Sequence, residues 1–309
     1  MQVFSKLMDL TQLYPKIVMA LGTFDGVHVG HQSIIRQAIS LAASIHGTSL
    51  VFTFSNHPLS VIAPDKAPLQ IGDTISKENI LAEMGVDILV NIPFTRKFAK
   101  ISPDQFLTDL RDNFGPAYIV VGPNFSFGHR GKGNPRMLMR EGRSYGFKAE
   151  IAAAVQWHGR TVSSTRIREL LLAGELEMAN EFLGRAFSFG GRVVHGDRRG
   201  RLLGFPTANL AIADHRAMLP NGVYAVKVTL RGERYDGIAN IGTNPTFAGC
   251  NRRLEVHILD FSGDIYDAAL QVQFLKKIRD EQKFPSADHL VKQLHADEAT
   301  ARILFNVHD

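Results

Sequence analysis

The segment GTFDGVHVGH, residues 22–31, constrains the fold more than any other part of the chain. Residues 17–21 before it are uniformly apolar, as in a strand that is covered on both faces. After it, apolar residues recur at helical spacing, at Ile34, Ile35, Ala38, Leu41, Ala42 and Ile45. A strand, a glycine-rich turn and a helix start together offer free N–H groups to an anion. The segment therefore predicts an α/β fold with a phosphate site.

The rest of the first half continues this alternation of strands and helices. Short apolar runs at residues 49–54, 88–92 and 118–121 each precede a loop that contains Pro, Gly or Asn. Parallel strands joined by crossover helices give this pattern, and open sheets of this kind bind ligands at the carboxyl ends of their strands. We therefore expect a Rossmann-like α/β domain in the first half.

The second half has a different pattern. Segments of β type, broken by glycine, cover residues 187–195, 222–230, 235–241, 254–261 and 269–275. Strands at this spacing predict a small antiparallel barrel or sandwich. A closing helix is expected after Pro285, with Ser286 as N-cap and an apolar face of Leu290, Leu294, Ile303 and Leu304. Helical patterns at residues 165–173 and 176–183 precede Gly184, where we place the boundary between domains 1–183 and 184–309.

Composition sets the class of protein. The chain has 309 residues, 45% hydrophobic and 21% charged, which fits two folded domains and excludes a disordered protein. Its net charge of +5 suits anionic partners. The single cysteine, Cys250, excludes an intrachain disulfide and agrees with a reducing cytosol. No stretch approaches the roughly 18 apolar residues of a membrane span. We expect a cytoplasmic protein with no membrane contact.

Two imidazoles, His28 and His31, lie near the predicted helix start. There they can donate hydrogen bonds to the α-phosphate or the leaving pyrophosphate of a nucleoside triphosphate. A zinc site is less well supported, because no Cys or acidic cluster nearby completes a ligand set. The segment GTFDGVHVGH resembles the signature motif of the nucleotidyltransferase superfamily. Gly22, Phe24 and Gly30 of the same turn are candidates for binding ATP.

Two further segments fit a nucleotide site. RTVSSTRIRELL, residues 160–171, places hydroxyl and guanidinium groups at a helix start, and the candidates for phosphate binding there are Ser164, Thr165, Arg166 and Arg168. The alternative is an ordinary capped surface helix. VVGPNFSFGHRGKGN, residues 120–134, offers Asn124 and Phe125 to an aromatic ring system, although its phenylalanines can equally belong to the core.

The chain has no P-loop, because Gly131-Lys132 is followed by Gly133 and not by Ser or Thr. The second half nevertheless holds another candidate site. In LLGFPTANL, residues 202–210, Thr207 and Asn209 offer hard oxygen ligands to Mg²⁺ on a triphosphate. The preceding GDRRGR contributes Gly196 and Arg201 as phosphate-binding candidates. Alternation in RLEVHILDF, residues 253–261, turns Glu255 away from the core. There it is either a solvated side chain or the base for an attacking hydroxyl.

Taken together, GTFDGVHVGH, FTFSNHP (52–58), VGPNFSFG (121–128) and VSSTRIRELL (162–171), followed by a β-rich half, resemble the prokaryotic bifunctional riboflavin kinase and FMN adenylyltransferase family. The resemblance covers nearly the whole chain. It departs at Asn56, where the family more often has proline, and at Val29, where a basic or larger residue is common. The first departure leaves flavin contacts near Asn56 open.

The resemblance implies one role for each motif. His28 and His31 stabilise the transferring phosphate, Asn124 belongs to the nucleotide and flavin site, and Ser164, Thr165 and Arg168 bind phosphates. In the second domain, a six-stranded antiparallel barrel in this family, Thr207 and Asn209 handle Mg²⁺ and phosphate. Glu255 is the general base there. Arg279, in the segment IRDEQKF (278–284), helps to close over the flavin.

The sequence thus predicts a two-step enzyme with ATP as co-substrate and Mg²⁺ at both sites. Riboflavin is phosphorylated to FMN in the C-terminal domain, and FMN is adenylylated to FAD in the N-terminal domain with release of pyrophosphate. The alternative is a nucleic-acid-binding protein that carries a basic barrel. We favour the enzyme and expect no nucleic-acid partner, because the basic residues lie in glycine loops beside polar ligands. The sequence leaves the oligomeric state open.

Overall fold

The computed structural model describes residues 1–196, 200, 203–246 and 249–306. They form two compact units, Met1–Ser164 and Thr165–Asp309. The second unit includes α6 (Ser164–Ala173) from Thr165 onward and α7 (Leu176–Leu183), because α7 packs against strands of that unit. These two helices match the predicted helical patterns. The functional boundary at Gly184 stays a prediction.

The first unit is built on a six-stranded parallel sheet of order β1-β4-β3-β2-β5-β6. Its strands are β1 (Gln2–Phe4), β2 (Ile17–Leu21), β3 (Thr48–Phe54), β4 (Ile88–Ile92), β5 (Tyr118–Val121) and β6 (Lys148–Ile151). The prediction of a parallel α/β sheet is confirmed, and so are the four central strands. The edge strands β1 and β6 escaped prediction because they are short and mostly solvent-accessible, and so lack a continuous apolar run.

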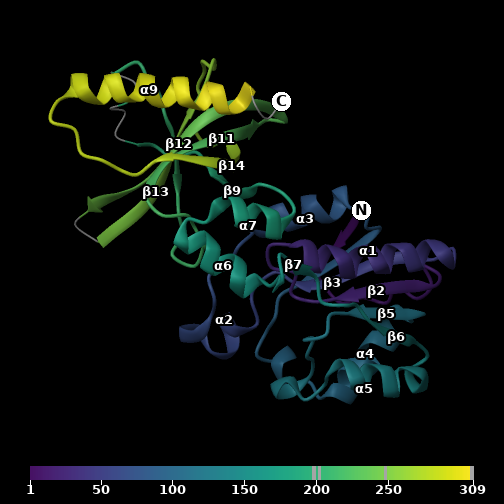
Figure 1. Ribbon diagram of the computed structural model, residues 1–309. Helices are drawn as coiled ribbons and strands as arrows, with labels where there is room; N and C mark the ends of the chain where they lie inside the picture. Colours follow the sequence, from purple (N-terminus) through teal and green to yellow (C-terminus); the bar gives the residue numbers. More distant parts are fainter. Residues whose placement is uncertain (197–199, 201–202, 247–248, 307–309) are drawn as a thin grey trace. The chain divides into compact units, whose positions relative to one another are not determined.

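Helices cover both faces of this sheet (Figure 1). Val18 and Ala20 of β2 pack with α1 (Val29–Ser44), whereas Met19 and Leu21 pack on the opposite face with α4 (Pro103–Phe114). Because successive side chains of a strand point to opposite faces, β2 contributes to a hydrophobic core on each side of the sheet. The remaining helices and the hairpin are α2 (Leu59–Ile62), η1 (Pro64–Lys66), α3 (Thr74–Glu83), η2 (Phe98–Lys100), η3 (His129–Gly131), α5 (Pro135–Glu141), η4 (Gly142–Tyr145), β7 (Gln156–Trp157) and β8 (Arg160–Thr161).

Strand β2 marks the switch point of the sheet. The chain passes from β2 to β3 on one side and later returns to β5 on the other side. Loops that leave neighbouring strands in opposite directions open a crevice at the carboxyl edge, where ligands bind in open α/β sheets. The glycine turn (residues 22–28) and the loop that begins at Gly122 both leave the sheet at this crevice.

The second unit is an antiparallel sheet of order β10-β13-β12-β11-β14-β9 that curls toward closure. Its strands are β9 (Phe187–Arg192), β10 (Ala208–Ala211), β11 (Gly222–Leu230), β12 (Glu233–Thr246), β13 (Gly249–Ile258) and β14 (Ala269–Arg279). A bridge between Val194 and Asn209 joins the end of β9 to β10. This seam confirms the predicted barrel, to which β10 adds a short strand that the sequence pattern did not reveal.

Helix α9 (Ala287–Asn306) lies across β11 and β12 of the barrel (Figure 1). Ser286 caps it as predicted, since its hydroxyl oxygen accepts a hydrogen bond from the His289 N–H. The prediction that Ile303 belongs to the packed face is wrong, because its side chain is 65% exposed. The buried stripe runs instead through Asp297, Ala301 and Phe305, which follow one another at a spacing of four residues. The other three predicted residues, Leu290, Leu294 and Leu304, are partly buried, and Leu304 packs against the same core as Ala301 and Phe305.

Candidate active sites

A cavity of about 520 Å³ opens at the carboxyl edge of the parallel sheet. The loops after β2, β3, β4, β5 and β6 line it, together with residues 161–164. The candidate site residues that meet at this cavity are Gly22, Phe24, His28, Gly30, His31, Asn124, Phe125 and Ser164. Three motifs that are distant in the sequence therefore converge at the switch point.

The two histidines form a stacked pair. Their ring centroids lie 3.6 Å apart, and His28 Nδ1 accepts a hydrogen bond from the His31 N–H at 3.2 Å, which makes His28 the N-cap of α1. Because Nδ1 accepts, the proton of a neutral His28 lies on Nε2, the atom able to donate to a ligand. A Cβ on Gly30 would lie 3.1 Å from the His28 ring, so glycine leaves room for this imidazole over the helix start.

The glycine turn has a strained backbone. Phe24 and Val27 have φ values of 47° and 38°, in the left-handed region that bulky residues rarely adopt, and both side chains are fully buried. Phe24 and His31 meet edge to face with ring centroids 5.3 Å apart, and both line the cavity. A Cβ on Gly22 would lie 2.9 Å from the Phe24 ring, so glycine is required at that position as well.

Hydrogen bonds from outside the turn hold this backbone. The Asp25 carboxylate accepts from the N–H groups of Ile71 (3.1 Å) and Gly72 (3.3 Å). The Ser164 hydroxyl donates to the Asp25 carbonyl at 3.0 Å, and the Gln32 amide donates to the Val27 carbonyl at 3.0 Å. The conformation that presents the histidines is thus imposed by tertiary contacts.

Phenylalanines form one side of the cavity, which we call the aromatic wall: Phe54, Phe94, Phe98, Phe106, Phe125 and Phe127. Neighbouring rings in it meet mostly edge to face, as Phe54 and Phe94 do with centroids 5.0 Å apart. Asn56 anchors the wall, because its amide donates to the Phe94 carbonyl (3.1 Å) and accepts from the Phe94 N–H (2.7 Å). Sequence reasoning found Phe125 and missed most of the others, although the alternating FTF of β3 is a signal.

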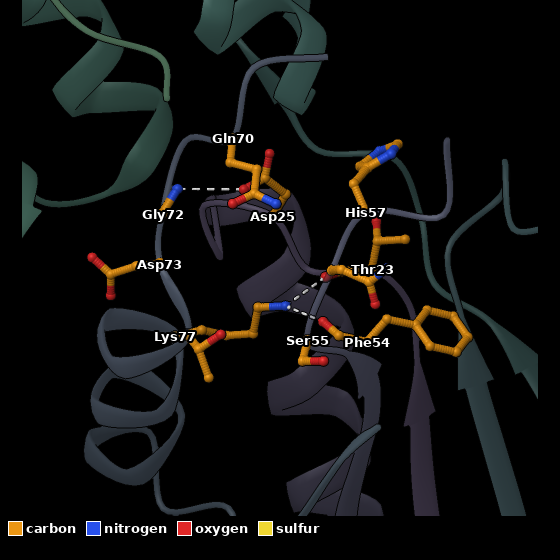
Figure 2. Close-up of a pocket in the computed structure, with 11 residues that line it drawn as sticks. Thr23, Asp25, Phe54, Ser55, His57, Gln70, Gly72, Asp73 and Lys77 are labelled. Carbon is orange, nitrogen blue, oxygen red and sulfur yellow. Dashed lines mark hydrogen bonds between the residues drawn. The ribbon is translucent and has the colours of Figure 1, made fainter. Parts of the chain in front are cut away.

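Lys77 of α3 was also missed by the sequence analysis. Its Nζ donates to the carbonyls of Thr23 and Phe54, both at 3.0 Å (Figure 2). It also donates to Thr53 Oγ1 at 3.3 Å. Burial lowers the pKa of Lys77 to about 8, against the opposing influence of the Asp25 and Glu78 carboxylates. No local motif marks this lysine, because its partners lie on other elements.

The candidates on α6 follow Ser164 in the chain and belong to the second unit. Thr165 is exposed, and Arg168 is half-buried. Arg166 forms an ion pair with Glu169 at 2.9 Å on the surface of the helix.

In the barrel, Glu255 stands on β13 between two asparagines. It pairs with Asn209 on β10 and with Asn240 on β12, so the three side chains share one face of adjacent strands. Its neighbours Leu254 and Val256 are fully buried, which confirms the predicted alternation. Carboxylate and amide oxygens therefore meet beside the Pro-Thr-Ala-Asn element.

The Pro-Thr-Ala-Asn element is held by its surroundings. His257 Nδ1 lies 2.8 Å from the Pro206 carbonyl, which can only accept, so this nitrogen carries the proton. A Cβ on Gly196 would lie 2.3 Å from Asn209 Nδ2, so Gly196 is required for the close approach of that amide. Thr207 lines a cavity of about 590 Å³.

Arg279 and Arg201 complete the second set of candidates. The Arg279 guanidinium binds the buried Asp297 carboxylate through Nε and Nη2, at 2.9 and 2.7 Å, and lies over the Phe284 ring. Arg201 lies outside the residues that the structure describes, as do Arg198 and Arg199.

The first unit carries paired histidines at the switch point of a parallel sheet. The second unit is an antiparallel barrel in which Glu255 pairs with two asparagines. This combination defines the class of protein, an ATP-using group-transfer enzyme. A family model described as FAD synthetase matches residues 11–166, and one described as riboflavin kinase matches residues 183–305. The chain belongs to the family of bifunctional riboflavin kinases/FMN adenylyltransferases. The FAD synthetase part is N-terminal and the flavokinase part is C-terminal, with riboflavin, FMN, FAD and ATP as substrates and products.

Relatives support this assignment over nearly the full length. The chain is 40% identical over 293 residues to the bifunctional riboflavin kinase/FMN adenylyltransferase of Escherichia coli (strain K12), covering 94% of this chain and 93% of the relative. Identity to the enzyme of the same description from Bacillus subtilis (strain 168) is 36%, covering 93% and 92%. A solved structure described as a macrolide-efflux protein from Streptococcus pneumoniae matches with a TM-score of 0.86 at 34% identity, covering 98% and 99%. Within the described part of the chain, no helix has the length and apolar character to cross a membrane.

Proposed function

We propose that adenylyl transfer takes place in the 520 Å³ cavity of the first unit. A phosphate oxygen of FMN attacks the α-phosphorus of ATP, and the bond to the leaving pyrophosphate breaks. His28 and His31 donate hydrogen bonds to the oxygens on which charge develops. The observation that carries this proposal is the convergence of the glycine turn, the histidine pair, Asn124 and Ser164 on one cavity.

The two substrates occupy different walls of this cavity. The aromatic wall suits the isoalloxazine ring of FMN, which stacks on Phe125 and its neighbours while the exposed Asn124 amide binds the polar edge of the ring. The triphosphate lies along the N-terminal end of α1, against Gly22, the Phe24 backbone and Gly30. The Ser164 hydroxyl, which lines the same cavity, adds a hydrogen-bond donor for phosphate. Phosphate binding by Thr165, Arg166 and Arg168, which follow Ser164 in the chain, stays a prediction from the sequence.

We further propose that the barrel phosphorylates riboflavin beside Glu255. The 5′-hydroxyl of riboflavin attacks the γ-phosphorus of ATP, Glu255 accepts the hydroxyl proton, and ADP leaves. Gly196 and Arg201 belong to the phosphate loop of this site. Arg279 positions the segment next to the flavin through its ion pair with Asp297.

The oxygen donors at the barrel fit Mg²⁺. Magnesium in proteins takes few protein oxygens, completes its shell with phosphate and water, and neutralises charge on the transferring phosphoryl group. Thr207 and Asn209 supply a hydroxyl and an amide oxygen beside the face that carries Glu255. The described residues contain no cluster of three or more His, Cys, Asp and Glu side chains able to hold a metal ion, in keeping with a cation bound mainly through ATP. The lone cysteine supports a cytoplasmic location, where the thiol stays reduced.

Two substitutions test the assignment of each reaction to its site. Glu255→Ala is expected to stop FMN formation from riboflavin, ATP and Mg²⁺ and to leave the conversion of FMN to FAD intact. His31→Ala is expected to do the reverse. Chromatography of the flavins measures both reactions in one sample. Loss of both activities from a folded single variant, or of neither, contradicts the proposal.

A further inference from the structure

Lys77 joins the ends of two neighbouring parallel strands. Its ammonium has three protons, and three oxygens surround it: the Thr23 carbonyl beyond β2, and Thr53 Oγ1 and the Phe54 carbonyl at the end of β3. Thr53 Oγ1 in turn donates to the Thr23 carbonyl at 2.9 Å. Each proton of the cation therefore has its own acceptor, and Thr53 links two of the acceptors to each other. Figure 2 shows the hydrogen bonds to Thr23 and Phe54.

The two strand ends lead into two different parts of the lining of the 520 Å³ cavity. Thr23 begins the strained turn that leads to His28, and Phe54 belongs to the aromatic wall; both line the cavity themselves. Phe24 and Val27 have a left-handed backbone, which bulky residues keep only where several surrounding contacts hold it in place. The ammonium supplies such a restraint at Thr23, where the turn leaves the sheet.

We propose that Lys77 is a positioning residue for FMN adenylylation, whose ammonium fixes the turn that presents the histidines relative to the aromatic wall. The inference rests on the proposed placement of adenylyl transfer in this cavity. Lys77 touches neither substrate in this scheme. It acts through backbone carbonyls, and its loss misaligns the phosphate-binding side against the flavin-binding side.

The restraint depends on the positive charge of the Lys77 ammonium. The ionisable groups that face the ammonium are Asp25 on the glycine turn and Glu78 on its own helix, while His57 and Asp73 line the same small pocket. Burial lowers the pKa of Lys77 to about 8. A neutral amine has two protons for three oxygens and turns a lone pair toward one of them, so the restraint weakens when the proton leaves.

The test compares Lys77→Met, Lys77→Arg and the control Lys66→Met, which alters an exposed lysine of the same unit. For Lys77→Met we expect kcat of FAD formation to fall on the order of 10²-fold, the effect of a misplacement of about 1 Å. The KM for ATP should change less, because the ground-state contacts remain. Riboflavin phosphorylation by the same chain is the internal control and should stay at the wild-type rate, as should both reactions of Lys66→Met.

The pH profile separates positioning from mere support of the fold. In wild type and Lys66→Met, kcat of FAD formation should fall above about pH 8, the pKa of Lys77. This fall of kcat above pH 8 should be absent in Lys77→Arg, whose side chain keeps its charge, and in Lys77→Met, whose side chain has none. Unaltered kcat in Lys77→Met, or a fall above pH 8 that persists in Lys77→Arg, overturns the inference. If Lys77→Met does not fold, the comparison of wild type with Lys77→Arg decides alone.

His31→Ala distinguishes this inference from the proposal on which it rests. If His31→Ala keeps its adenylyl transfer, the placement of the reaction in this cavity fails. If His31→Ala loses adenylyl transfer while Lys77→Met keeps it, only the role of Lys77 fails.

Discussion

Gly196→Ala should silence the kinase while leaving the rest of the chain intact. The added Cβ would lie 2.3, 2.6 and 2.8 Å from Nδ2, Cγ and Oδ1 of Asn209, so the whole amide is in its way. The Asn209 backbone cannot follow, because its carbonyl accepts the Val194 N–H at 2.8 Å and β10 pairs with β13. The Asn209 side chain must therefore move away from the added Cβ while its backbone stays in place.

The size of that withdrawal sets the expected effect. Ordinary contact begins at 3.4 Å, so the amide must move by about 1.1 Å from its partner position opposite Glu255. A shift of about 1 Å in a group that positions a substrate lowers turnover on the order of 10²-fold. If Asn209 holds Mg²⁺ on ATP, the Mg²⁺ concentration needed for half-maximal rate should rise as well.

Steady-state phosphorylation of riboflavin, with Mg²⁺ varied, measures this loss, and FAD formation from added FMN shows that the first unit is intact. Gly191→Ala is the matched control, because the nearest atom to its Cβ is the end of the Leu210 side chain at 3.3 Å and the next atoms lie at 3.8 Å. Wild-type kinase turnover in Gly196→Ala, with an unchanged Mg²⁺ requirement, would refute the role of the Asn209 amide.

Three further predictions concern stability and the flavin side. Asp297→Ala leaves the Arg279 guanidinium beside an empty position and should cost about 3–5 kcal/mol in the urea unfolding of the barrel, whereas a cost near zero would contradict the buried pair. Asn56→Ala removes both hydrogen bonds to Phe94, about 1 kcal/mol each, and should raise the KM for FMN more than the KM for ATP; equal changes would count against this role. Because burial lowers the pKa of Lys77 from 10.5 to about 8, the unfolded chain binds more protons between these values, so stability should rise with pH there. Urea midpoints of wild type should show this rise and those of Lys77→Met should lack it.

Local patterns predicted the parts of the fold and site that depend on neighbouring residues. The central strands of the first sheet are uninterrupted apolar runs, and the alternation around Glu255 placed that carboxylate correctly away from the core. His28 and His31 belong to one motif, so their meeting required no tertiary knowledge. Short strands with exposed faces, such as β1 and β6, gave no such signal.

Long-range contacts account for what the sequence did not reveal. Lys77 meets Thr23 across 54 positions of the chain, and Asn56 meets Phe94 across 38. Nothing near either residue marks the partner. On α9, Ile303 fits the apolar pattern and yet is exposed, whereas Asp297 is buried in an ion pair with Arg279 of β14.

The seam of the barrel, the bridge between Val194 and Asn209, couples local opening of the barrel to ligand binding at the kinase site. The Val194 N–H closes the seam on the carbonyl of Asn209, the residue whose amide faces Glu255. In the described part of the chain this contact is an isolated bridge, so the seam has less cooperative support than the ladders on the other strands. Ligand that orders Asn209 should therefore slow amide hydrogen exchange at Val194. Binding of a nucleotide at one end of β10 would thus stabilise the pairing that closes the barrel.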